Sequence, residues 1–136
     1  MTEKFLLDTS YLIALEFKRD QAHQLAVRSW RELSRSRPSL VVTSHIFDEV
    51  VTFFNSRDRH GKAVEIGNRL LYDSTVEFVK VDRSLLDRAW AYFQQHDDKS
   101  YSLTDCLSFI VMEREGIDTA LTFDRHFLQA GFSKRP

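Results

Sequence analysis

The sequence predicts an α/β fold, with a mostly parallel sheet of about four to five strands covered by helices on both faces. Three observations support this fold class: short apolar runs that suit buried strands, longer segments with helical spacing between them, and few chain-breaking residues. The 136 residues include 11 Phe but only 4 Gly and 2 Pro. Strands that alternate with helices join in parallel, because each helix carries the chain back across one face of the sheet.

The predicted strands are four short apolar runs. They are residues 5–7, 40–42, 76–81 and 119–123. The first three are typical of buried strands, because few polar residues interrupt them. The fourth is compatible with a strand and follows Gly116, a residue type that commonly ends a helix.

Six segments between these runs have the apolar spacing of helices. They are residues 12–18, 22–33, 45–57, 63–72, 85–95 and 103–115. Ser10, Ser44 and Ser102 precede three of them, and Asp82 or Ser84 precedes the fifth. The side-chain oxygens of Ser and Asp accept hydrogen bonds from the free N–H groups at a helix start, so these residues are predicted as N-caps.

Composition excludes several classes of protein. The single cysteine, Cys106, cannot form an internal disulfide. No apolar stretch approaches the roughly 20 residues of a membrane-spanning helix, and no secretory signal precedes the first strand. We therefore expect one cytoplasmic domain over residues 1–136, without a membrane segment. The formal net charge of −1 does not by itself favour nucleic-acid binding.

Two acidic residues lie where predicted strands end. Asp8 follows the first apolar run and Asp124 follows the last. Ligands of open parallel α/β sheets bind beyond the carboxyl ends of the strands, so both side chains are candidates for a functional crevice. An Asp between a strand and a helix is also a common N-cap, which is the alternative for each of them.

A third candidate, Glu49, lies on the predicted helix 45–57. On a helical wheel, Glu49 is at the edge of the apolar arc beside Phe53, whereas Asp48 points nearly opposite. No Lys or Arg lies three or four residues from Glu49. A half-buried acid without a partner costs free energy, so Glu49 is predicted as a ligand and Asp48 as a solvated surface acid.

Asp105 is the fourth candidate, at the start of a helix that is apolar almost all round. Such a helix is expected at the centre of the fold. None of the residues at helical spacing from Asp105 is basic. A favourable position at the positive helix N-terminus is the alternative explanation, but it accounts for one acid and not for four.

A hard divalent cation is the partner that such carboxylates fit. Mg²⁺ prefers oxygen ligands and is commonly bound by a few carboxylates together with substrate phosphates. The histidines show no His-x-x-x-His pair with a suitably spaced acid, so a zinc site is not expected. Glycine-rich phosphate loops and a Gly-x-Ser-x-Gly motif are also missing from the sequence.

Four segments resemble, in this order, the motifs of PIN domains. They are residues 6–15 (LLDTSYLIAL), 44–50 (SHIFDEV), 102–108 (SLTDCLS) and 121–127 (LTFDRHF). The resemblance covers nearly the whole chain and is greatest to the stand-alone PIN proteins that include VapC-type toxins. It implies a three-layer αβα fold and a ribonuclease that depends on Mg²⁺ or Mn²⁺, with Asp8, Glu49, Asp105 and Asp124 as catalytic, metal-binding acids.

The resemblance also implies partners: an RNA substrate, an antitoxin protein and a second copy in a homodimer. Apolar residues of the first two helices, Leu12, Phe17 and Trp30, are candidates for antitoxin docking, with a place in the core as the alternative. Hydroxyl groups that hold the acids by hydrogen bonds are expected from Ser10, Thr104 and Thr122, although Ser10 and Thr104 can also cap helices. Basic residues expected to contact phosphate are Arg125, Arg57, Arg59 and Lys62.

Two other functions compete with the ribonuclease. A PIN-like module that binds RNA or protein without cutting usually lacks one or more of the four acids, and none is missing here. A metal-dependent nuclease acting on DNA, or a phosphatase of similar design, uses the same chemistry. A panel of matched RNA and DNA substrates separates these alternatives.

Overall fold

The computed structural model of this chain describes residues 2–136. Within these residues, five strands form one sheet in the order β3-β2-β1-β4-β5, and all neighbouring strands are parallel. The strands are β1 (Lys4–Leu7), β2 (Ser39–Thr43), β3 (Val76–Val79), β4 (Thr119–Leu121) and β5 (Ser133–Arg135).

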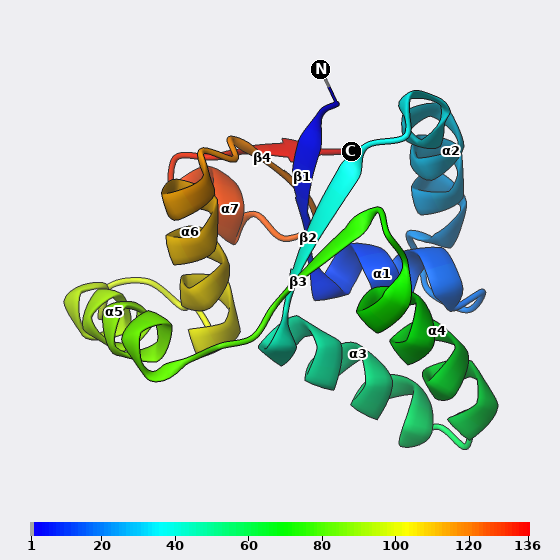
Figure 1. Cartoon of the computed structure of the whole chain (residues 1–136), viewed down its shortest axis with the longest axis horizontal. Helices are drawn as coiled ribbons and strands as arrows, with labels where there is room; N and C mark the ends of the chain where they lie inside the picture. Colours follow the sequence, from blue (N-terminus) through cyan, green and yellow to red (C-terminus); the bar gives the residue numbers. More distant parts are fainter. Residues whose placement is uncertain (1) are drawn as a thin grey trace.

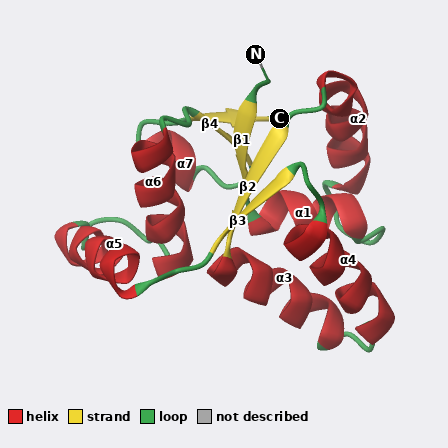
Figure 2. Cartoon of the chain, in the orientation of Figure 1, coloured by secondary structure: helices red, strands yellow, loops and turns green. Residues whose placement is uncertain are grey.

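Helices cover both faces of this sheet. In Figure 1, α1, α2 and α4 lie on one side of the strands, whereas α5, α6 and α7 lie on the other. The helices are α1 (Thr9–Glu16), α2 (His23–Leu33), α3 (Ser44–Asn55), α4 (His60–Tyr72), α5 (Arg83–Gln95), α6 (Leu103–Glu115) and α7 (His126–Gln129), with a short 3₁₀ turn at Ser34–Ser36. The three layers are clear in Figure 2, and the predicted αβα architecture is confirmed.

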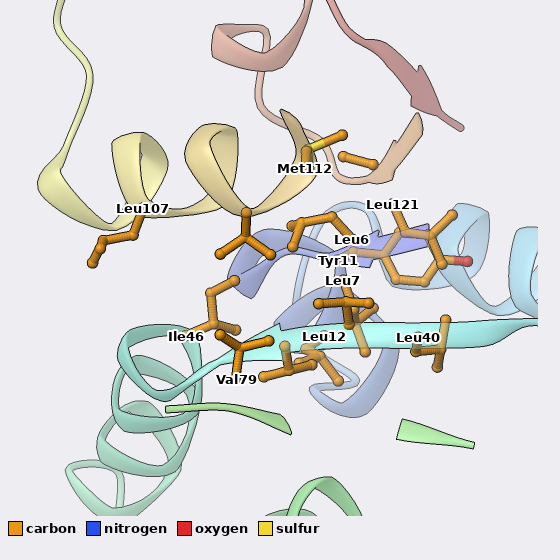
Figure 3. Close-up of a cluster of buried hydrophobic side chains, with 14 of the residues drawn as sticks. Leu6, Leu7, Tyr11, Leu12, Leu40, Ile46, Val79, Leu107, Met112 and Leu121 are labelled. Carbon is orange, nitrogen blue, oxygen red and sulfur yellow. The ribbon is translucent and has the colours of Figure 1, made fainter. Parts of the chain in front are cut away.

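The core is built around the central strands and α6. Leu6, Val41 and Leu121, from three neighbouring strands, are fully buried, as expected for strands covered on both faces. Side chains from the strands and from both helical layers meet in this core (Figure 3). In α6, every residue from Thr104 to Met112 is buried, which confirms its predicted central position. Burial raises the pKa of the Cys106 thiol to about 11, so this cysteine packs and does not act as a nucleophile.

Two strands and two N-caps differ from the predictions. The third strand ends at Val79 and the fourth at Leu121, so both are shorter than their apolar runs. The helix after β1 begins at Thr9, and Ser10 therefore lies inside its first turn and does not cap it. The N-cap of α3 is Thr43, whose Oγ1 accepts a bond from the Ile46 N–H, and not the predicted Ser44.

Other caps follow the prediction. Asp82, one of the two candidates before α5, accepts a bond from the backbone N–H of Leu85. Ser102 caps α6 and forms a reciprocal capping box with Asp105. These caps satisfy N–H groups that have no partner within their helices.

The last elements, α7 and β5, were not predicted. Their segments of 4 and 3 residues are too short to show a periodic pattern, and β5 is an exposed edge strand. β5 exists because the chain turns back at Gly131, whose φ is 94°, and pairs with β4. Across residues 2–136, no helix has the length and apolarity needed to cross a membrane.

Candidate metal centre

Three of the four predicted acids gather at the carboxyl edge of the sheet. Asp8 directly follows β1, and its backbone N–H donates to the carbonyl of Leu121 at the end of β4. Asp124 lies three residues beyond Leu121, and Asp105 lies in the first turn of α6. The pairing of β1 with β4 therefore brings together segments that are more than 100 residues apart in sequence.

Asp8 is a buried carboxylate held by two hydroxyl groups. The residue is 5% exposed, and its Oδ2 accepts bonds from Thr122 Oγ1 at 2.8 Å and Ser10 Oγ at 3.0 Å. Burial and, to a smaller extent, the negative charge of Asp105 raise the pKa of Asp8 to about 6, against the opposing effect of these bonds. A buried acid that shares its site with a second acid is unfavourable as an anion unless a cation is bound nearby.

Asp105 and Asp124 converge on one imidazole ring. The Nδ1 atom of His126 lies 2.8 Å from Asp105 Oδ2 and 3.2 Å from Asp124 Oδ1. The backbone N–H of His126 also donates to Asp124 Oδ1, at 2.9 Å. One ligand atom from each of the three residues lies within 4.8 Å of the others, so they form a group that can hold a metal ion.

Asp105 is both a helix-capping residue and a member of the acid cluster. Its Oδ2 accepts from the backbone N–H of Ser102, and its own N–H donates to Ser102 Oγ, both at 3.0 Å. Asp105 is thus a helix-capping acid at a favourable N-terminus. The same carboxylate also faces His126, so the cap orients it toward the other acids.

Glu49 is more exposed than predicted. The fully buried stripe of α3 is Ile46, Val50 and Phe54, which is narrower than the predicted apolar arc and leaves Glu49 outside it. The carboxylate is nevertheless fixed, because Thr9 Oγ1 donates to Oε1 at 2.6 Å and Thr104 Oγ1 donates to Oε2 at 3.1 Å. These donors are the sequence neighbours of Asp8 and Asp105, so Glu49 borders the same site.

The predicted hydroxyl groups make the contacts that shape this site. Ser10 and Thr122 hold Asp8, and their hydroxyl oxygens are 3.1 Å apart. Thr122 also accepts a bond from the backbone N–H of Asp124 at 2.9 Å, which ties the loop after β4 to the buried carboxylate. Thr104 holds Glu49 and none of the three aspartates. None of these hydroxyls is an N-cap, so the alternative given for Ser10 and Thr104 is wrong.

Arg125 is the one predicted phosphate contact that the structure places beside the acids. Its exposed side chain lines an open hollow of about 650 Å³. The other residues lining the hollow are Ser10, Phe123, Asp124, His126 and Gln129. Asp124 thus adjoins an open surface depression that is also lined by the basic side chain of Arg125.

The other predicted phosphate contacts lie elsewhere, around the turn between α3 and α4. The Arg57 guanidinium stacks 3.7 Å from the ring centre of Phe53, and the Arg59 guanidinium lies 5.5 Å from that of Phe17. Lys62 Nζ pairs with Glu16 at 2.9 Å. The structure does not bring these three cations together with the acids.

The sequence interpretation missed two residues of the site, Thr9 and His126. A hydroxyl next to Asp8 was visible, but its partner Glu49 is 40 positions away. His126 follows Asp124 by two residues, and it was considered only as part of a zinc pair. A search for any nitrogen donor close to a predicted acid could have found it.

The donor set fits a divalent cation. Carboxylate oxygens, with or without one imidazole, suit ions such as Mg²⁺ and Mn²⁺, and the site contains no thiolate, because Cys106 is buried in α6. Burial disfavours the charged form of Asp8, and Asp105 and Asp124 lie close together, so a bound cation would stabilise the ionised acids of this site.

Comparison with known proteins is consistent with this geometry. The sequence model of the PIN domain matches residues 5–133. The chain is 39% identical over 128 residues to the 23S rRNA-specific endonuclease VapC20 of Mycobacterium tuberculosis, and the alignment covers 93% of each protein.

Solved structures show the same relationship. The crystal structure of VapC20 from Mycobacterium tuberculosis, described as a toxin that cleaves the sarcin–ricin loop, superposes with a TM-score of 0.85 and 33% identity, over 94% of this chain and 95% of that one. A toxin–antitoxin complex from Klebsiella pneumoniae has a TM-score of 0.65 at 15% identity, over 97% and 96% of the two chains, which is a likeness of fold alone. This chain belongs to the PIN domain family.

Proposed function

We propose that this chain is an endoribonuclease that hydrolyses RNA phosphodiester bonds with a bound divalent ion, Mg²⁺ or Mn²⁺. The observation that carries the proposal is the meeting of Asp8, Asp105 and Asp124 at one edge of the sheet, with Glu49 fixed at their border. The 39% identity to a 23S rRNA-specific endonuclease over 93% of both proteins supports the assignment to RNA cleavage.

Asp105 and Asp124 would bind the ion directly, and Asp8 directly or through water. A divalent ion bound by these residues would supply polarisation of the phosphate oxygens and would offset the negative charge that develops on them during hydrolysis. Ser10 and Thr122 keep the Asp8 carboxylate in one orientation, so little reorganisation is needed when substrate arrives.

Glu49 has a different task from the aspartates. It is exposed to solvent, whereas Asp8 and Asp105 are buried, and its two oxygens are each held by a threonine hydroxyl. An accessible carboxylate at the border of the site can accept a proton from the attacking water. In this proposal Glu49 is the general base and takes a proton from the attacking water. The water oxygen bonds to phosphorus as the bond from phosphorus to the leaving oxygen breaks on the opposite side, and the leaving oxygen takes a proton from solvent.

Arg125 supplies the cation that contacts the substrate backbone. It lines the hollow beside Asp124 and takes part in none of the salt bridges formed within residues 2–136. An unpaired arginine next to an acidic centre offsets the repulsion between the acids and an approaching phosphate. The substrate proposed from the similarity to VapC20 is a structured loop of 23S rRNA.

A cognate antitoxin is part of the proposal, because VapC20 is a toxin. The predicted docking residues are placed differently by the structure: Leu12 is buried, whereas Phe17 and Trp30 are half-buried. Leu12 and Trp30 line an apolar cavity of about 290 Å³ between α1, α2 and α4. We propose that an antitoxin segment occupies it. If a neighbouring gene encodes a small antitoxin, adding that protein should inhibit cleavage.

The predicted homodimer is tested separately, by light scattering of this chain alone.

Cleavage of ribosomal RNA by the purified protein and by its Asp105→Asn variant tests the proposed ribonuclease activity and the place of Asp105 in its site. Asn retains an oxygen that can cap α6, so the variant should fold while its site loses one negative charge. Asp48→Asn is the matched control, since it removes the same charge from an exposed position on α3.

We expect cleavage of RNA but not of matched DNA, in Mg²⁺ or Mn²⁺ but not in EDTA. Asp48→Asn should cut normally and Asp105→Asn should not. Equal cleavage by the wild type and Asp105→Asn would contradict the assigned site. Binding of RNA without cleavage in any metal would point to a non-catalytic module, and cleavage of DNA to the other competing function.

A further inference from the structure

His126 lies within the acid cluster, although the resemblance to PIN domains gave this residue no role. Its Nδ1 atom lies 2.8 Å from Asp105 Oδ2 and 3.2 Å from Asp124 Oδ1. These two carboxylates come from α6 and from the loop after β4, so the imidazole is the point where the two segments meet. Three electron-rich atoms at this separation require a proton or a metal cation between them.

The separations suit a shared metal ion. Ligands of Mg²⁺ lie about 2.1 Å from the ion, so adjacent corners of an octahedron are about 3 Å apart. The two distances from Nδ1 bracket this value. The backbone N–H of His126 fixes Asp124 Oδ1 at 2.9 Å, which keeps one carboxylate in place when the ring approaches an ion.

The ring is also held in the orientation that a ligand needs. On its far side, Nε2 lies 3.3 Å from Ser100 Oγ, and the ring of Tyr101 packs edge-on at 5.4 Å between centroids. In the tautomer with its proton on Nε2, the ring donates to Ser100 and presents the lone pair of Nδ1 to the acids. Metal-binding histidines are commonly oriented in this way through their second ring nitrogen.

We propose that His126 is a nitrogen ligand of the divalent ion, bound through Nδ1 beside Asp105 and Asp124. The inference rests on the proposed metal-dependent function and adds a ligand to it. Imidazole suits transition metals better than Mg²⁺, which prefers oxygen. The site therefore favours Mn²⁺ over Mg²⁺ more strongly than an all-carboxylate site does.

Pulsed electron paramagnetic resonance of bound Mn²⁺ tests this directly, without reference to activity. A coordinated imidazole nitrogen produces a strong ¹⁴N modulation of the Mn²⁺ echo. The full chain would be loaded with less than one equivalent of Mn²⁺, so that the tightest site is observed. The variants are His126→Asn and the longer His126→Gln, with thermal unfolding in EDTA to establish that each is folded.

His60→Asn is the matched control. His60 is exposed at the start of α4, where its Nδ1 lies 2.9 Å from Asn55 Oδ1 and away from the acids. We expect the nitrogen modulation in the wild type and in His60→Asn, and its loss in both His126 variants. Mn²⁺ affinity should fall roughly tenfold or more on loss of the ligand, and Mg²⁺ affinity should fall less.

The outcomes separate this inference from the proposed function. Bound Mn²⁺ without nitrogen modulation, or modulation that survives in a folded His126 variant, overturns the ligand assignment. In that case His126 only donates a hydrogen bond to the carboxylates, and metal-dependent RNA cleavage can still stand. Failure of Mn²⁺ to bind at all overturns both the ligand assignment and the metal-dependent function.

Discussion

The pH dependence of stability after Asp8→Asn tests the electrostatics of the site. Asp8 is 5% exposed, and one of its oxygens accepts both side-chain hydrogen bonds, from Thr122 and Ser10. Asn keeps a carbonyl oxygen that can accept these bonds. The substitution therefore removes the charge while the surrounding packing changes little.

The magnitude follows from the raised pKa of Asp8. Burial raises it from 3.8 to about 6, and one pKa unit corresponds to about 1.4 kcal/mol, so the ionised carboxylate lowers the free energy of unfolding by up to about 3 kcal/mol. A carboxyl group with a higher pKa in the folded chain binds its proton more tightly there. The free energy of unfolding of the wild type consequently falls as the pH rises from about 4 to about 6. In Asp8→Asn this pH-dependent decrease should be missing.

Urea unfolding in EDTA at several pH values measures the effect. The quantity of interest is the free energy of unfolding of Asp8→Asn minus that of the wild type, because other titrating groups largely cancel in this difference. We expect it to increase by up to about 3 kcal/mol between about pH 4 and about pH 7. Saturating Mn²⁺ should then stabilise the wild type more than the variant, because the variant lacks one of the acids.

A difference that stays constant with pH in EDTA would refute this reasoning. It would mean that the Asp8 carboxylate is not destabilised by burial, and that the site does not need a cation to balance it. A pH-dependent difference that is unchanged by Mn²⁺ would leave the burial effect intact but exclude Asp8 as a metal-binding group.

Three further predictions concern the other groups of the site. Thr122→Val should lower the free energy of unfolding, measured in urea, by about 1–3 kcal/mol. The substitution removes a buried hydroxyl that donates to Asp8 and accepts from the Asp124 N–H, and an unchanged stability would contradict this. Glu49→Gln should lower the cleavage rate roughly 10²–10⁴-fold with folding unaffected, whereas Asp48→Asn should not; equal rates would exclude a general base at Glu49. Arg125→Ala should weaken RNA binding and reduce the slope of log affinity against log salt by about one, measured by fluorescence anisotropy with Arg83→Ala as the control.

The fold was largely predictable because its signals are local. Central strands buried on both faces are continuous apolar runs, and α6 is apolar almost all round because it lies in the middle of the molecule. α7 and β5 escaped prediction for the opposite reason. The residues Ser133–Arg135 contain no apolar side chain, and they form a strand only because the edge of β4 is available for pairing.

The site was predictable in part. The acids at strand ends and at the start of α6 could be identified because parallel strands bring their carboxyl ends to one edge. The exposure of Glu49 could not, because the width of the buried stripe on α3 depends on which elements pack against it. The same limit applies to Arg59 and Lys62, whose partners Phe17 and Glu16 lie at the end of α1. Arg57 instead stacks on Phe53, four residues earlier in the chain.

The sequence alone therefore determined the class of fold and the central helix, and it singled out the four acids that we propose for the metal site. Only the tertiary structure decided that His126 meets Asp105, a residue 21 positions away, and that Thr104 holds Glu49 across 55 positions. The physical reason is that apolar periodicity records which side of an element faces the core. It carries no information on which polar side chains from distant elements come within hydrogen-bond distance, because that is settled by how the layers pack.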